Sequence, residues 1–274
     1  GVLSVSYVFG GAAAIALAGA VAEASGGSWR AVMFVPAVVL AVAGVAASIL
    51  LPPAPAVPNG AAASPAVGKD RSTLRGLLRD RGFQVVCVLS FVLTLVREIF
   101  NDWSVDFIKS EGGAGVSLRL ASFLSLPFDL CGASGILVMG FLLGRLQPRS
   151  RRGLIAGNLV VLAISLLLLP RAAALGLPWL VSLVGLIGFC GLGPYSLLAG
   201  YFSVRLRGPA AAGTVSGLID SVGYLAGVLA GSGFGWILDR WGYGTGFSIL
   251  AGTALVAVAL AFFLPSFPSD EDNA

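Results

Sequence analysis

The sequence predicts an all-α protein that crosses a membrane several times. Its mean hydropathy is +0.94 and 11% of its residues are charged, about half the share found in soluble domains. Eight apolar runs have roughly the length that a helix needs to cross about 30 Å of hydrocarbon. They cover residues 3–22, 31–51, 83–107, 119–142, 153–169, 177–203, 211–238 and 244–264. Transmembrane β-strands would alternate polar and apolar residues, and these runs do not.

The first two runs are separated from the other six by a stretch of different composition. Residues 52–82 are rich in Pro and Ala and end in a basic, amphipathic segment, which is typical of a linker. We therefore predict four parts: the last two helices of one bundle at 1–51, a cytoplasmic linker at 52–82, a six-helix bundle at 83–264 and a tail at 265–274. Since the chain begins without Met, we expect it to start inside a larger protein, after four further helices.

Lys and Arg predict the orientation in the membrane. One set of loops carries Lys69, Arg71, Arg75, Arg79, Arg81, Arg145, Arg149, Arg151, Arg152, Arg205 and Arg207. The other set carries Arg30, Lys109, Arg119, Arg171 and Arg240. Because basic loops stay in the cytoplasm, we expect the richer set, and both ends of the chain, on that side. The basic residues reflect topology, and they form no clustered face that would indicate nucleic-acid binding.

Arg97 is the most informative residue, because it lies deep in the third apolar run. A guanidinium at the centre of a spanning helix costs about 2.5–3.5 kcal/mol on insertion scales, so it usually faces a bundle interior or an aqueous cavity. It also keeps its proton. This fixed positive charge predicts an anionic ligand.

Other polar residues share faces of the apolar runs. Thr94 and Asn101 lie on the same helical face as Arg97, and Glu98, Asp102 and Asp106 follow on an adjacent face.

In the seventh run a stripe combines small residues with one carboxylate and one phenol: Gly213, Gly217, Asp220, Tyr224, Gly227 and Gly231. We interpret the glycines as helix-packing positions. Asp220 and Tyr224 are either cavity residues or packing residues. Asp129 in the fourth run is a further carboxylate, and an ion pair with an arginine of another helix is its simplest interpretation.

The remaining polar chemistry is sparse. Cys87, Cys131 and Cys190 all fall within apolar runs, and the chain has no histidine, so we expect small buried thiols and neither a metal site nor a cofactor. No nucleophile and base are paired in the sequence, which argues against an enzyme.

Several segments resemble the organophosphate:phosphate antiporters of the major facilitator superfamily, which include glycerol-3-phosphate and hexose-phosphate transporters. The segment around Arg97 is similar to the seventh-helix motif of that family, and it reads Val96-Arg97-Glu98-Ile99-Phe100-Asn101-Asp102-Trp103. Gly193-Pro194 resembles its tenth helix, and Gly213-Thr214 with Gly223-Tyr224-Leu225 resembles its eleventh. The front end, with Gly10-Gly11, Trp29-Arg30-Ala31 and Pro36-Ala37, resembles helices five and six.

The resemblance implies that this chain holds helices five to twelve of a twelve-helix antiporter. The protein would lie in the bacterial inner membrane and exchange glycerol 3-phosphate or sugar phosphate for inorganic phosphate by alternating access. Arg97 matches the family's arginine that contacts substrate phosphate, and Tyr224 matches a tyrosine near it. Tyr7 stands where glycerol-phosphate members have a histidine, and Thr94 where they have a tyrosine. Between Gly140 and Arg145 the chain has glycine in place of the family's usual acidic residue.

Two other functions stay open. A proton-coupled carrier of another organic anion or a drug could use Glu98, Asp129 and Asp220 as its proton relay. A membrane sensor that binds a ligand without transporting it could be built on the same fold.

Overall fold

The computed structural model describes residues 2–50, 71–113, 115–203, 206 and 211–264, and the secondary-structure elements in these residues are all helices. The first two predicted runs fold as α1 (Val2–Ala24) and α2 (Trp29–Leu50). The basic, amphipathic end of the predicted linker folds as α3 (Arg71–Arg79). The rest of that linker and the predicted tail at 265–274 lie outside the described residues.

The second group of helices carries the predicted six-helix region. Its elements are α4 (Arg81–Glu111), α5 (Leu118–Ser125), α6 (Pro127–Arg145), α7 (Pro148–Leu175), α8 (Leu177–Leu197), the π-helical η2 (Leu198–Phe202), α10 (Ala212–Val228), the π-helical η4 (Leu229–Gly233) and α11 (Phe234–Ala261). Within the described part of the chain, 6 helical segments are long and apolar enough to cross a membrane. This architecture confirms the prediction of a polytopic, all-α membrane protein.

The structure differs from the predicted runs in two places: the seventh and eighth runs are joined in one bent helical segment, and the fourth run is divided into two helices. The longest segment, Ala212–Ala261, is bent at Gly242, whose φ of 72° and ψ of 176° are not helical. The bend separates the seventh predicted run from the eighth. The fourth predicted run is divided at Leu126, because Pro127 begins a new helix there. Proline suits a first helical turn, where its missing N–H is not needed.

Glycines allow some of these helices to approach closely. A Cβ atom added to Gly188 of α8 would collide with the Phe128 carbonyl oxygen of α6, and one added to Gly135 of α6 would collide with the Phe189 carbonyl oxygen. Similarly, a Cβ on Gly223 of α10 would lie 2.8 Å from Thr94 Oγ1 of α4. Contacts of this kind, between small residues, hold helices together where lipid removes most of the hydrophobic driving force.

The predicted glycine stripe of α10 does not pack in this way. A Cβ added at Gly213, Gly217 or Gly231 would meet no atom of the described residues within 4 Å, and one added at Gly227 would meet Glu98 Cγ at 3.9 Å. Within the described residues our packing interpretation is therefore wrong for Gly213, Gly217 and Gly231, whereas Gly227 makes an ordinary contact with α4. The closest approach of α10 to α4 is at Gly223, which lies one turn before Gly227 on the same side of the helix.

Aromatic side chains fill the middle of the bundle, and the thiols are also covered. The Phe100 ring stacks on Phe128 at 5.0 Å between centroids, while Phe107 meets Phe247 edge-on at 4.9 Å. Cys87 and Cys190 are buried and Cys131 is half-buried, all three as free thiols. This confirms the expectation of buried thiols for Cys87 and Cys190, while Cys131 is only partly covered.

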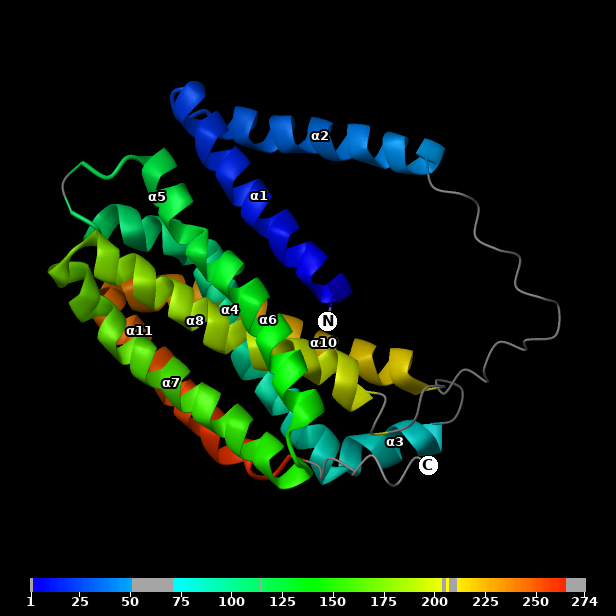
Figure 1. Ribbon diagram of the computed structural model, residues 1–274. Helices are drawn as coiled ribbons and strands as arrows, with labels where there is room; N and C mark the ends of the chain where they lie inside the picture. Colours follow the sequence, from blue (N-terminus) through cyan, green and yellow to red (C-terminus); the bar gives the residue numbers. More distant parts are fainter. Residues whose placement is uncertain (1, 51–70, 114, 204–205, 207–210, 265–274) are drawn as a thin grey trace.

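The first two helices form a hairpin at one side of the bundle. In Figure 1, α1 lies along α5 and α6, and α2 leads away from the remaining helices. No described residue of α2 is buried, although the helix is strongly apolar. Within the described residues α2 therefore has little protein cover, while α1 contributes Val8 and Gly11 to one side of a cavity.

Candidate functional site

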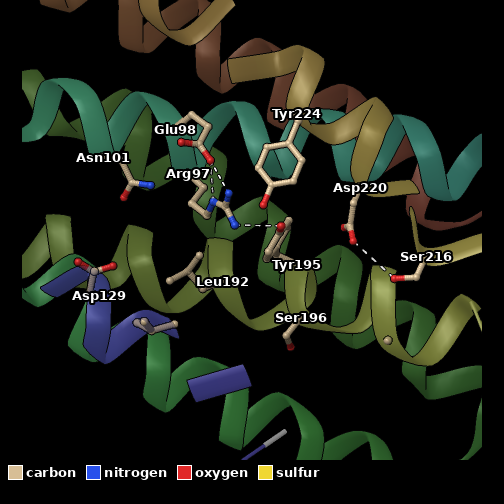
Figure 2. A pocket seen from close by; sticks show the side chains of 13 residues that line it. Arg97, Glu98, Asn101, Asp129, Leu192, Tyr195, Ser196, Ser216, Asp220 and Tyr224 are labelled. Carbon is tan, nitrogen blue, oxygen red and sulfur yellow. Dashed lines mark hydrogen bonds and ion pairs between the residues drawn. The ribbon is translucent and has the colours of Figure 1, made fainter. Parts of the chain in front are cut away.

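A cavity of about 610 Å³ lies between α1, α4, α6, α8, η2 and α10. Its lining residues are Val8, Gly11, Arg97, Glu98, Asn101, Asp129, Leu192, Tyr195, Ser196, Gly200, Ser216, Asp220 and Tyr224. In Figure 2 the labelled side chains lie around a shared space, with Arg97 near its centre. The cavity therefore joins polar residues from helices that are far apart in the sequence.

Arg97 reaches this cavity from the middle of α4. It follows Arg81, the first residue of the helix, by 16 residues and precedes Glu111, the last, by 14. At 1.5 Å per residue these separations correspond to about 24 Å and 21 Å. The side chain is only 13% exposed. The structure thus places a fixed cation at mid-depth beside a cavity, which is where an intramembrane arginine is tolerated.

Two tyrosines surround the guanidinium. Arg97 Nη1 donates a hydrogen bond to the Tyr195 hydroxyl at 2.9 Å. The Arg97 Cζ atom lies 4.8 Å from the ring centroid of Tyr195 and 5.8 Å from that of Tyr224. Both distances are within the range of cation–π attraction. The phenols therefore stabilise the charge without neutralising it.

Glu98 is the ion-pair partner of Arg97. Both Nε, at 3.0 Å, and Nη2 donate to the same oxygen, Glu98 Oε1. Neighbouring residues of a helix do not normally face each other, so the two long side chains bend together at the edge of the cavity. Glu98 thus holds the edge of the guanidinium that a bidentate anion would use.

Two further carboxylates face the same space. Asp129 comes from α6, near Asn101 of α4, and Asp220 comes from α10 (Figure 2). Ser216 Oγ donates to Asp220 Oδ2 at 3.5 Å. No basic side chain among the described residues lies within 4.0 Å of either aspartate. The expected ion pair between Asp129 and an arginine of another helix is therefore not present in this part of the chain.

The Gly193-Pro194-Tyr195 segment of α8 positions the main hydrogen-bond partner of Arg97. Pro194 lies inside α8 and is buried, and its missing N–H removes one hydrogen bond from the helix. A Cβ on Gly193 would lie 3.1 Å from the Gly135 carbonyl oxygen, so α6 approaches closely here. Three residues after Tyr195 the chain continues as the π-helical η2. Segments of this kind often occur beside functional sites.

The residues that the sequence predicts as substrate-binding candidates are Arg97, Tyr224, Asn101, Thr94, Asp220 and Tyr7, and the structure brings four of these six together. Arg97, Asn101, Asp220 and Tyr224 all line the cavity. Tyr224 is 59% exposed, so its phenol is accessible. Thr94 differs, because its Oγ1 is buried against Gly223 and has no hydrogen-bond partner within the described region. It is a packing residue in this structure. The backbone of Tyr7 belongs to α1, but its side chain lies outside the described residues.

Sequence reasoning missed five polar lining residues as ligand candidates, namely Glu98, Asp129, Tyr195, Ser196 and Ser216. Tyr195 directly follows the Gly193-Pro194 segment, and a phenol in a strongly apolar run is a signal that could have found it. The serines had no such signal, because serine is common on packed membrane helices.

This arrangement suits recognition of an anion. It offers a guanidinium, the Tyr195 and Tyr224 hydroxyls and the Asn101 amide in one cavity, and together they could hold several oxygens of a phosphate group. Within the described residues no group of three or more His, Cys, Asp or Glu could hold a metal ion.

Comparison with known proteins agrees with the fold. The sequence profile of the Major Facilitator Superfamily matches residues 1–231. A probable hexose phosphate transport protein of Chlamydia pneumoniae is 30% identical over 307 residues, covering 99% of this chain and 64% of that protein. A probable hexose phosphate transport protein of Chlamydia muridarum is 28% identical over 199 residues, covering 72% of this chain and 42% of that protein. The chain thus spans less than two thirds of the length of these relatives.

Proposed function

The chain belongs to the major facilitator superfamily, and we propose that it is part of a secondary active transporter that exchanges organic phosphates for inorganic phosphate. The single observation that carries this proposal is the position of Arg97. Its guanidinium lies at mid-depth in the helical bundle and faces a cavity of about 610 Å³. A planar fork of N–H donors matches two oxygens of a phosphate group.

The geometry suggests how a phosphate group would bind. Glu98 holds Nε and Nη2 of Arg97 in this structure. An incoming phosphate would replace or share that carboxylate, while Tyr195 keeps its hydrogen bond to Nη1. Glu98 then acts as an internal anion that satisfies the arginine when substrate is absent. This exchange limits the cost of leaving a buried cation unpaired.

We place the substrate in the sugar phosphate class. This assignment is supported by the relatives, which are named probable hexose phosphate transport proteins, and by the resemblance around Arg97. Glycerol 3-phosphate is the other substrate that the resemblance implies. The family match and the transporter names also agree with the expectation that the chain is not an enzyme.

The transport step would be alternating access of two helical bundles around this cavity. On this proposal α1 and α2 belong to one bundle and residues 83–264 to the other, with the linker and both ends in the cytoplasm. The first bundle would add four helices that precede this chain, and the membrane would be a bacterial inner membrane.

The test is a counterflow measurement with the full-length protein that contains this chain. Vesicles loaded with phosphate should take up glucose 6-phosphate, and vesicles loaded with sulfate should take up little. A proton ionophore should leave the exchange unchanged. Uptake that does not depend on internal phosphate would contradict the antiport mechanism.

A proton-coupled carrier is the second candidate, and the carboxylates of the cavity favour it. Asp129 and Asp220 both face the space beside Arg97 without a basic partner in the described part of the chain. Carboxylates inside a membrane are common elements of proton pathways. For such a carrier the same ionophore would abolish accumulation of substrate, so the counterflow assay separates the two candidates.

A further inference from the structure

The cavity beside Arg97 contains more acidic than basic groups. Glu98 neutralises Arg97, and Asp129 and Asp220 remain. A phosphate dianion entering this space would meet two carboxylates that carry its own sign of charge. Among the lining residues that the structure describes, Arg97 alone is basic. When the guanidinium binds phosphate, Asp129 and Asp220 therefore remain without a cationic partner among these residues.

Asp129 is the more constrained of these two carboxylates. The residue is 7% exposed, and no hydrogen bond or ion pair joins its side chain to another described residue. Figure 2 shows its carboxylate directed into the cavity. Burying an ionised group without a partner is costly. Asp220 has at least the Ser216 hydroxyl as a donor. Asp129 is thus the carboxylate that most requires a cationic or donating ligand.

Asp129 and Arg97 also lie at similar depth. The turn between α4 and α5 joins the ends of the two helices on one side of the bundle. Asp129 follows the start of α5 at Leu118 by 11 residues, and Arg97 precedes the end of α4 at Glu111 by 14. At 1.5 Å per residue these separations are about 16 Å and 21 Å. Both side chains line the same cavity, with Asn101 beside them (Figure 2).

We propose that this cavity takes a zwitterionic organophosphate, whose phosphate meets Arg97 and whose ammonium group meets Asp129. The inference rests on the proposed function and narrows its substrate class to amino-sugar phosphates and similar molecules. The phosphate takes the place of Glu98 at the guanidinium, and the ammonium group donates to the carboxylate of Asp129. Arg97 and Asp129 then each have a partner of opposite sign, as buried charges generally require.

The experiment compares two ligands that differ at a single position. Glucosamine 6-phosphate and glucose 6-phosphate share the ring and the phosphate, but the first has an ammonium group in place of one hydroxyl. In vesicles with the full-length protein, both compete with labelled glucose 6-phosphate for uptake. We expect glucosamine 6-phosphate to compete at about tenfold lower concentration, the scale of one hydrogen bond between charged groups.

Substitutions at Asp129 test whether its carboxylate causes the preference for glucosamine 6-phosphate. Asp129→Asn keeps the size of the side chain and removes its charge, and the ratio of the two half-inhibition concentrations should then fall to about one. Asp129→Glu keeps the charge and should retain a preference, which covers the case in which the Asn variant fails to fold. Asp102→Asn is the matched control, since Asp102 lies on α4 outside the cavity. It should leave the ratio as in the wild type.

Equal competition by both ligands in the wild type would overturn the inference while leaving the proposed function intact. A preference that persists in Asp129→Asn would overturn the assignment to Asp129. If glucose 6-phosphate is not exchanged at all, the proposed function fails. The inference is then tested by thermal stabilisation of the purified protein with each ligand. The inference would be overturned if glucosamine 6-phosphate and glucose 6-phosphate stabilise the protein equally, or if neither stabilises it.

Discussion

Arg97 and Tyr195 are joined in two ways. The guanidinium donates from Nη1 to the Tyr195 hydroxyl at 2.9 Å, and its Cζ atom lies 4.8 Å from the centre of the same ring. The two residues are 98 positions apart in the sequence. Tyr195 therefore determines both the direction and the electrostatic surroundings of the cation.

Arg97→Lys tests whether the planar fork is needed. Lysine keeps the charge but loses the pair of parallel N–H donors, so we expect phosphate affinity to fall by about 10- to 100-fold. Competition of phosphate against labelled glucose 6-phosphate in vesicles measures this. Arg240→Lys is the matched control, because Arg240 lies over the Trp236 ring, outside the cavity. If Arg97→Lys binds phosphate as tightly as the wild type, Arg97 contributes only its charge and not the paired N–H donors.

Tyr195→Phe tests the hydrogen bond while keeping the ring. We expect roughly tenfold weaker phosphate binding, since one donor–acceptor pair with a charged member is lost. Tyr243→Phe removes the same kind of hydroxyl, which donates to Asp106 Oδ2 at 2.5 Å away from the cavity. In a phosphate titration Tyr195→Phe should therefore bind phosphate more weakly than the wild type, whereas Tyr243→Phe should bind it as the wild type does. If both weaken phosphate binding equally, the effect does not come from contact with Arg97.

Glu98→Gln tests the internal competition for the guanidinium. The amide keeps the size but is a weaker partner for Arg97, so phosphate should bind several-fold more tightly, an effect of about 1 kcal/mol. Equilibrium binding of phosphate to the purified protein measures this, with Asp102→Asn as the control. Weaker binding in Glu98→Gln would show that Glu98 orients Arg97 for the ligand instead of competing with it.

Asp220→Asn separates the two coupling mechanisms. An antiporter should keep phosphate exchange, because Asp220 repels the substrate anion. A proton-coupled carrier should lose accumulation against a gradient but keep passive exchange. Both activities are measured in vesicles with and without an imposed pH gradient. Loss of accumulation alone would exclude the antiporter, and loss of folded protein would show that Asp220 is structural.

Gly223→Ala should destabilise the bundle. The added Cβ would lie 2.8 Å from Thr94 Oγ1 and 3.0 Å from Ser90 Oγ, and overpacking of this kind typically costs about 1–3 kcal/mol. A lower midpoint of thermal unfolding in detergent is the expected result. Gly217→Ala is the control on the same helix, since its Cβ would meet no atom within 4 Å.

Combining Gly223→Ala with Thr94→Ala checks the mechanism of this effect. Removing the threonine hydroxyl should restore part of the lost stability, so the two substitutions should not be additive. Strict additivity would show that the collision between α4 and α10 is not the cause.

The sequence was sufficient to predict the class of fold and the central residue of the site. Helical spans in lipid are recognisable from composition, because each must cover about 30 Å of hydrocarbon with apolar residues. Arg97 was recognisable for the same reason, since a charge in such a run needs a special environment. Gly213, Gly217 and Gly231 were misinterpreted, because the spacing of small residues does not tell which face of a helix meets a neighbour.

The tertiary structure decided which polar groups share a space. It placed Tyr195 on Arg97, paired Glu98 with the same guanidinium and left Asp129 facing the cavity. It also moved Thr94 from the site to the packing surface against Gly223. These relationships depend on the rotation and approach of helices that are distant in the chain. Hydropathy and spacing describe each helix by itself, whereas the surroundings of a side chain are determined only when the helices pack together.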